Sequence, residues 1–145
     1  MSYTYDYPRP MVTVDCLVFS RRKDATHLLL IQRDKPPYEG SWALPGGFVD
    51  MDETLPKAAM RELEEETNLK DISLQQFQTF GDPGRDPRGR TISVVYFGFT
   101  NHAQADTHAG SDARNARWFS IDSLPPLAFD HDQIIGLAIK KLDLY

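Results

Sequence analysis

Acidic side chains cluster in one short stretch of this 145-residue chain. Five of its six glutamates lie between positions 53 and 66, and Glu62, Glu65 and Glu66 are close together near the end of that stretch. On a helix that advances about 100° per residue, Glu65 and Glu66 lie roughly 60° and 40° to either side of Glu62. Like charges at this spacing repel one another. A bound cation would relieve the repulsion, and an all-oxygen ligand set favours Mg²⁺, Mn²⁺ or Ca²⁺.

Apolar residues share the same arc of this expected helix. Leu55, Ala58 and Leu69 lie on it, so the carboxylates should face the protein. No Lys or Arg lies on the arc, and Arg61 falls to one side of it. An acidic helix face in contact with solvent is the plainer interpretation, which the glutamates alone favour. The residues around them decide between a solvated face and a metal site.

The surrounding residues follow a longer pattern. Gly47, Glu53 and Arg61 precede the glutamates at fixed spacing, and residues 47–69 read G-x5-E-x7-R-E-L-x-E-E-x-x-L. This pattern closely resembles the Nudix box, the signature of the Nudix hydrolase family. The chain departs from the signature at Asn68, where the family has glycine. Asparagine is the next-best residue for the left-handed conformation that ends many helices, so the helix should still end there.

The resemblance implies metal-dependent hydrolysis of a diphosphate that links a nucleoside to another group. Carried onto this chain, it makes Glu62, Glu65 and Glu66 metal ligands, with Mg²⁺ as the expected ion and Mn²⁺ as the alternative. Glu65 and Glu66 are also expected to be essential for turnover. The resemblance further implies that Arg61 orients these carboxylates from beside them, with Glu65 as its i,i+4 partner.

The loop ahead of the helix supplies further expected site residues. The resemblance places Glu53 at the helix entrance, as an additional metal ligand or as an anchor for the loop. Gly46 and Gly47 allow the backbone to turn tightly close to the phosphates of a substrate.

The general base is harder to place. Many relatives take it from a loop downstream of the box, often as a glutamate, but this chain has no Glu after position 66. Asp112, in the loop before an expected short strand, is the preferred candidate, and a turn-forming Asp is the equal alternative. Surface or loop positions are expected for the four histidines, which show no metal-ligand spacing: His27, His102, His108 and His131.

A glycine- and arginine-rich loop over residues 80–90 suggests the substrate. Arg85, Arg88 and Arg90 can present guanidinium groups to phosphate or ribose, although Arg85 could instead pair within the loop. The loop, taken with residues 41–49, resembles the ADP-ribose pyrophosphatase branch of the family. The reaction implied is hydrolysis of ADP-ribose to AMP and ribose 5-phosphate.

Three residues ahead of the box are further candidate substrate contacts. Tyr38 and Trp42 could stack on adenine, although core packing is the commoner fate of such a Trp, and Arg33 could contact phosphate. Two other functions stay open. One is hydrolysis of another nucleotide, such as a dNTP, NADH or a nucleotide sugar; the other is a sensor domain that binds ADP-ribose without cleaving it. No basic extension follows the last expected helix, so we expect hydrolysis.

The rest of the chain predicts one α/β domain over residues 1–145. Alternation and apolar runs predict strands at 11–20, 27–32, 41–44, 72–79, 91–100 and 116–119, with residues 48 and 49 extending the third. Helices are expected from Thr54 to Asn68 and over residues 131–142. The strand at 91–100 is apolar on both faces and should be central. The expected fold is a mixed β-sheet between helices, in agreement with the Nudix-like α/β/α sandwich that the resemblance implies.

Composition excludes several classes of protein. The net charge of −5 argues against broad nucleic-acid binding, and no apolar run reaches the ~18 residues of a membrane span. Cys16 is the only cysteine, which excludes an internal disulfide, and the polar start lacks a signal-peptide core. A cytoplasmic protein is expected, with a small nucleotide substrate as its partner. Relatives in the family are commonly homodimers, so a homodimer is expected here too.

Overall fold

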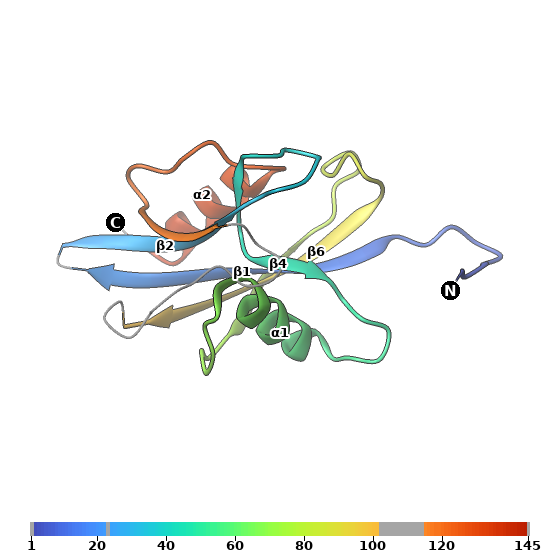
Figure 1. Ribbon diagram of the computed structural model, residues 1–145, viewed down its shortest axis with the longest axis horizontal. Helices are drawn as coiled ribbons and strands as arrows, with labels where there is room; N and C mark the ends of the chain where they lie inside the picture. The colour runs from blue at the N-terminus through green and yellow to red at the C-terminus, as the bar shows by residue number, and fades with distance from the viewer. Residues whose placement is uncertain (1, 23, 102–114, 145) are drawn as a thin grey trace.

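A computed structural model describes residues 2–22, 24–101 and 115–144 of the chain. In this part of the chain a seven-stranded sheet lies between two helices (Figure 1). The strands are β1 (Met11–Arg22), β2 (Ala25–Gln32), β3 (Trp42–Ala43), β4 (Gly46–Phe48), β5 (Gln75–Phe80), β6 (Thr91–Thr100) and β7 (Asn115–Ser120). The helices are α1 (Leu55–Thr67) and α2 (His131–Lys141).

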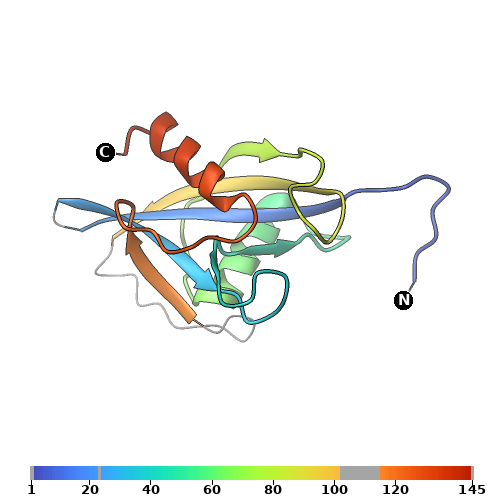
Figure 2. The same ribbon diagram turned by 90° about the horizontal axis from the view of Figure 1, so that it is seen from above.

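The sheet is mixed, as the sequence predicts. Its main path runs β3-β2-β1-β6-β5, with β4 paired to β1 and β7 paired to β2. Strands β1 and β6 run parallel, and the other strand pairs of the described sheet are antiparallel. Figure 2 shows β7 alongside β2. Strand β6 has a neighbour on each side, which confirms its expected central place.

The two faces of the sheet bury different residues of β1. Val14, Cys16 and Val18 pack under α1, whereas Leu17 and Phe19 pack under α2. Figure 1 shows the two helices on opposite sides of β1. Successive side chains of a strand point to opposite faces, so both faces of this central strand are apolar because a helix covers each one. The α/β/α sandwich expected from the sequence is confirmed.

Helix α1 begins and ends where its caps predict. The Thr54 hydroxyl accepts a hydrogen bond from the Lys57 backbone N–H at 3.3 Å, and Pro56 occupies the first turn. Asn68 adopts the left-handed conformation with φ of 67° and donates its backbone N–H to the carbonyl oxygen of Glu64 at 2.8 Å. The asparagine therefore performs the capping role of the glycine that the signature has.

Strand β4 differs from the expectation that residues 48 and 49 continue the strand at 41–44. It is a separate strand that pairs with β1, whereas β3 pairs with β2. The backbone turns between the two at Pro45. Gly46 then lies so close to β1 that a Cβ atom there would be 2.1 Å from the carbonyl oxygen of Val14. Neither helix in the described residues is long and apolar enough to cross a membrane.

Candidate active site

Arg61 is the centre of the acidic cluster on α1. Its Nε and Nη2 atoms donate to the two oxygens of Glu53 at 2.9 and 2.6 Å. Its Nη1 atom donates to Glu62 at 2.9 Å and to Glu65 at 3.3 Å, and Nη2 also reaches the carbonyl oxygen of Phe48 at 3.1 Å. The expected i,i+4 contact of Arg61 with Glu65 is present, and because the side chain is long it also reaches Glu53 and Glu62.

Glu53 is held as an anchor of the loop that precedes α1. Beside its two bonds to Arg61, it accepts the backbone N–H of Asp50 at 2.9 Å. Hydrogen bonding to Arg61 is the main cause that lowers the pKa of Glu53 to about 2. Of the two roles expected for this residue, its contacts favour the anchor.

Two glycines bring strand β4 against the carboxylates of α1. The backbone N–H of Gly46 donates to Glu66 at 2.7 Å, and Glu66 is buried. A Cβ atom at Gly47 would lie 2.5 Å from the carboxyl carbon of Glu62, so only glycine leaves room for that carboxylate. These glycines therefore set the positions of two of the three expected metal ligands.

The carboxylate cluster fits a divalent cation in its chemistry. Glu62 and Glu65 both contact the same nitrogen of Arg61, so their oxygens already share one positive partner. As the side chains stand, no three acidic, His or Cys groups among the described residues converge on one point. The oxygen-only donor set suits Mg²⁺ or Mn²⁺.

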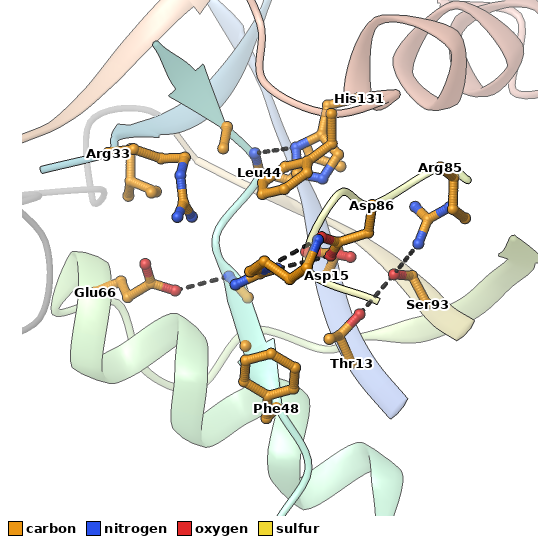
Figure 3. Close-up of a pocket in the computed structure, with 16 residues that line it drawn as sticks. Thr13, Asp15, Arg33, Leu44, Phe48, Glu66, Arg85, Asp86, Ser93 and His131 are labelled. Carbon is orange, nitrogen blue, oxygen red and sulfur yellow. Dashed lines mark hydrogen bonds and ion pairs between the residues drawn. The ribbon is translucent and has the colours of Figure 1, made fainter. Parts of the chain in front are cut away.

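A cavity adjoins the cluster on the other side of β4. Figure 3 shows it with Glu66 on one side and His131 on the other. It is lined by Thr13, Asp15, Ile31, Arg33, Ala43, Leu44, Gly46, Gly47, Phe48, Glu66, Arg85, Asp86, Arg88, Ser93, Phe129 and His131. Glu66 thus belongs both to the acidic cluster and to the cavity wall.

Two arginines converge at this cavity. The guanidinium carbons of Arg33 and Arg88 each lie 5.0 Å from the ring centroid of Phe129. Burial, followed by the charge of Arg88, lowers the pKa of Arg33. Arg88 is paired with Asp86 at 2.8 Å, while Arg33 donates its Nε–H to the carbonyl oxygen of Pro37 at 2.7 Å. An anion would relieve the repulsion between the two guanidinium groups, so the chemistry of this part of the cavity suits a phosphate.

The guanidinium group of Arg85 is hydrogen-bonded within the protein. Its guanidinium makes two bonds to Asp130, at 2.7 and 2.9 Å, and a third to the Ser93 hydroxyl at 2.7 Å. Its side chain is 5% exposed. Three of its five N–H donors are used in these bonds, so Arg85 holds the loop against the start of α2. Arg85 also lines the cavity, and its expected role as a substrate contact stays a prediction. Arg90 donates to the carbonyl oxygen of Gly81 and does not line the cavity.

Replacing Arg85 with methionine is expected to destabilise the protein by about 3–5 kcal/mol, because Asp130 would keep a largely buried, unpaired charge. Arg90→Met, in the same loop but exposed, should cost less than about 1 kcal/mol. Urea unfolding of both variants measures the difference. Equal losses would show that the Arg85–Asp130 pair contributes nothing special.

The two aromatic candidates have separate positions. Trp42 is buried in the core, with its ring 4.8 Å from that of Phe119, and it does not line the cavity. The expected stacking of Trp42 on adenine is therefore wrong, because its hydrophobic ring fills the space between the sheet and α2. Tyr38 is 44% exposed and its ring lies 5.0 Å from that of Phe129, so it stays close to the cavity wall. Asp112 lies outside the described residues.

The structure adds residues that sequence reasoning missed. His131 was expected on the surface or in a loop, yet it is buried, lines the cavity and accepts the Leu44 backbone N–H on Nδ1 at 3.0 Å. Phe129 and Ser93 carry no sequence signal for a site. Asp15 does carry one, since it is the single acidic residue within the apolar run that forms β1.

The pH dependence of protein stability should reveal that His131 is buried. Burial lowers its pKa from 6.5 to about 4, so the unfolded chain binds more protons between these values. The part of the unfolding free energy that depends on neutral His131 is therefore fully present above pH 6.5 and is lost as the pH falls to 4. In His131→Asn the amide oxygen can still accept the Leu44 N–H. Relative to this variant, the wild type should lose about 3 kcal/mol between pH 7 and pH 4.

Denaturant unfolding at a series of pH values tests this. The comparison must be a difference between the two proteins, because Asp15 titrates in the opposite sense: burial raises its pKa to about 7, so its contribution falls as the pH rises from 4 to 7. Parallel pH profiles of wild type and His131→Asn would contradict the prediction.

Comparison with known proteins agrees with this geometry. The NUDIX domain model matches residues 9–137. An ADP-ribose pyrophosphatase of Methanocaldococcus jannaschii is 40% identical over 129 residues, covering 89% of this chain and 73% of the relative. The ADPR responsive transcriptional repressor NtrR of Acinetobacter baylyi is 37% identical over 142 residues, covering 95% of this chain and 56% of the repressor, so the chain spans about half of that relative.

A solved structure extends the comparison to three dimensions. The NUDIX domain of Shewanella oneidensis NrtR, crystallised with ADP ribose, superposes with a TM-score of 0.87 at 33% identity, and the match covers 95% of this chain and 94% of that one. The match to the family model covers all of the acidic cluster and the cavity. The chain therefore belongs to the NUDIX family and is related to its ADP-ribose pyrophosphatases.

Proposed function

We propose that this protein hydrolyses ADP-ribose to AMP and ribose 5-phosphate in a reaction that requires Mg²⁺. The observation that carries the proposal is the meeting of two groups of opposite charge at one cavity. Glu66 of the acidic cluster lines the same cavity as Arg33 and Arg88. The relatedness to an ADP-ribose pyrophosphatase, at 40% identity, supports this choice of substrate.

The chain's own residues divide the work. Arg33 and Arg88 receive the negative charge of the diphosphate, and the cavity holds the group attached to it. Glu62, Glu65 and Glu66 would hold the Mg²⁺, which supplies positive charge to the phosphoryl oxygens and lowers the pKa of a bound water. Removing any one of the three carboxylates would weaken this ligand set.

Two residues keep the carboxylates in place. Arg61 contacts Glu62 and Glu65 directly, and Glu53 fixes Arg61 through two hydrogen bonds. The oxygen of water bonds to one phosphorus of the diphosphate, and the bond from that phosphorus to the bridging oxygen breaks. The bridging oxygen leaves on the other phosphate, so AMP and ribose 5-phosphate each keep one phosphate. Asp112 remains our proposed acceptor of the proton from that water.

A second candidate function has its own support. This chain is 37% identical to an ADPR responsive transcriptional repressor, so the alternative is a sensor domain that binds ADP-ribose without cleaving it. In that case Arg33, Arg88 and the cavity would serve recognition, and the carboxylates would not support turnover. A homodimer also stays a prediction, which a solution mass near twice 16.5 kDa would support.

Product analysis by chromatography separates these functions. The purified protein is incubated with ADP-ribose, with and without Mg²⁺, beside parallel reactions with NADH and a set of dNTPs. AMP formed from ADP-ribose only when Mg²⁺ is present is the expected result. Cleavage of another nucleotide in its place would change the substrate, and binding of ADP-ribose without cleavage would favour the sensor.

A further inference from the structure

Asp15 is a buried carboxylate that the proposed hydrolysis does not use. It lies on the cavity wall and is 7% exposed, on the face of β1 where Leu17 packs under α2. A carboxylate in such surroundings is costly unless a partner or a ligand compensates it. Arg85, whose charge acts on Asp15, is already bound to Asp130. Asp15 therefore has the character of a group kept for a ligand.

The glycine opposite Asp15 leaves room for its carboxyl group. A Cβ atom at Gly46 would lie 2.4 Å from Asp15 Oδ1. Burial raises the pKa of Asp15, while the charge of Arg85 and a hydrogen bond with Ser93 lower it. The oxygens of Asp15 are thus oriented from one side by Ser93 and border the cavity on the other.

His131 lines the same cavity, and its hydrogen bond to Leu44 fixes which ring nitrogen carries the proton. The Leu44 backbone N–H can only donate, so Nδ1 of His131 must carry a lone pair. A neutral imidazole then carries its proton on Nε2, which makes no hydrogen bond to any residue that the structure describes. His131 is 5% exposed, and its N–H donor and the carboxylate acceptor of Asp15 line one cavity (Figure 3).

Flat and apolar surfaces complete this part of the cavity. The ring of Phe129 lies 5.4 Å from that of His131, and Ile31 and Leu44 also line the wall. A planar heteroaromatic ring suits such walls, and one acceptor with one donor suits an edge that has the reverse pattern. Adenine has this edge: its 6-amino group donates, and a neighbouring ring nitrogen accepts. A 6-oxopurine would place an oxygen against Asp15.

We propose that Asp15 and His131 form a base-recognition pair that selects adenine over 6-oxopurines. The carboxylate accepts a hydrogen bond from the 6-amino group, and the Nε2–H of His131 donates to a ring nitrogen. Gly46 links this subsite to the proposed chemistry, since it contacts Asp15 on one side and Glu66 on the other. The inference rests on the proposed function in that the base belongs to the nucleotide whose diphosphate lies at Glu66.

Binding of AMP and IMP, measured by calorimetry with Mg²⁺ present, tests the pair independently of hydrolysis. These nucleotides differ only at the base edge in question. The wild type should bind AMP roughly tenfold to a hundredfold more tightly than IMP. In Asp15→Asn, whose amide can donate to the 6-oxygen, this ratio should approach one. Asp122→Asn, the same change at an exposed position away from the cavity, should keep the wild-type ratio.

A substrate comparison with the wild type alone covers the case in which Asp15→Asn does not fold. The kcat/KM for 1,N6-etheno-ADP-ribose, whose added ring blocks both edge positions, should fall about a hundredfold below that for ADP-ribose. Discrimination between AMP and IMP without any hydrolysis would support the pair and reject only the proposed function. Cleavage of ADP-ribose and its etheno analogue at equal rates would reject the pair and keep the function.

Two further results would also overturn the pair. One is failure of both AMP and IMP to bind. The other concerns Asp15→Asn: the variant would bind ribose 5-phosphate more weakly but keep the wild-type ratio of affinities for AMP and IMP. That result would mean that the Asp15 carboxylate binds the sugar and not the base.

Discussion

Replacing Glu66 with glutamine is expected to lower kcat for ADP-ribose hydrolysis about a hundredfold or more while the protein stays folded. Glutamine keeps the shape of the side chain and can still accept the Gly46 N–H, so the contact between α1 and β4 survives. It removes the negative charge, and a divalent ion contributes several kcal/mol to stabilising the transition state. Each 1.36 kcal/mol changes a rate about tenfold, so losing about 3 kcal/mol of that stabilisation is enough to lower kcat a hundredfold.

Glu64→Gln is the matched control. It makes the same change of charge on the same helix, but at an exposed position that faces away from the cavity. Release of AMP gives kcat for both variants, and circular dichroism with thermal unfolding reports the fold. A wild-type rate in Glu66→Gln would remove Glu66 from the chemistry. A loss of activity in both variants would point to the general field of the helix instead.

Alanine at the two adjacent glycines should separate stability from catalysis. At Gly46 the new Cβ would meet the backbone oxygen of Val14 at 2.1 Å, and a backbone atom can give way only if β4 moves off β1. We expect Gly46→Ala to destabilise the protein by about 3 kcal/mol or more. At Gly47 the new Cβ would meet the carboxyl group of Glu62, which is the movable end of a side chain.

Gly47→Ala should therefore stay close to wild type in stability but lose about tenfold to a hundredfold in kcat, because Glu62 is displaced from its place beside Arg61. Urea unfolding and the AMP assay, performed on both variants, make the comparison. Gly84→Ala, in a loop with no atom within 4 Å of the new Cβ, serves to measure the cost of a positive φ alone. Equal effects of Gly46→Ala and Gly47→Ala on stability would contradict this division.

The boundaries of α1 and the composition of the acidic cluster could be predicted because their causes are local. Thr54, Pro56 and Asn68 act on backbone groups within a few residues, and the periodicity of the glutamates places Glu62 and Glu66 on the protein side. The apolar strand β6 could be predicted for the same kind of reason: a run buried on both faces is typical of a central strand.

Local sequence patterns did not predict the ion-pair partner of a charged side chain that could reach several partners. The sequence placed Arg85 as a substrate contact or as a partner of a neighbouring Asp, but its partner is Asp130, 45 residues away. Arg33 and Arg88 were separate candidates until the fold brought both against Phe129. A charged side chain chooses among partners by distance and burial, which a sequence does not contain.

The sequence by itself determined the chemistry of the protein: the carboxylates, their spacing on one helix and the glycines ahead of them. Only the tertiary structure decided which residues line the cavity beside the acidic cluster. It buried His131 and fixed its donor nitrogen through Leu44, and it turned the carboxyl group of Asp15 toward the same cavity. The physical reason is that a helix specifies its own face through contacts three or four residues apart, whereas the walls of a cavity form only when distant strands pair.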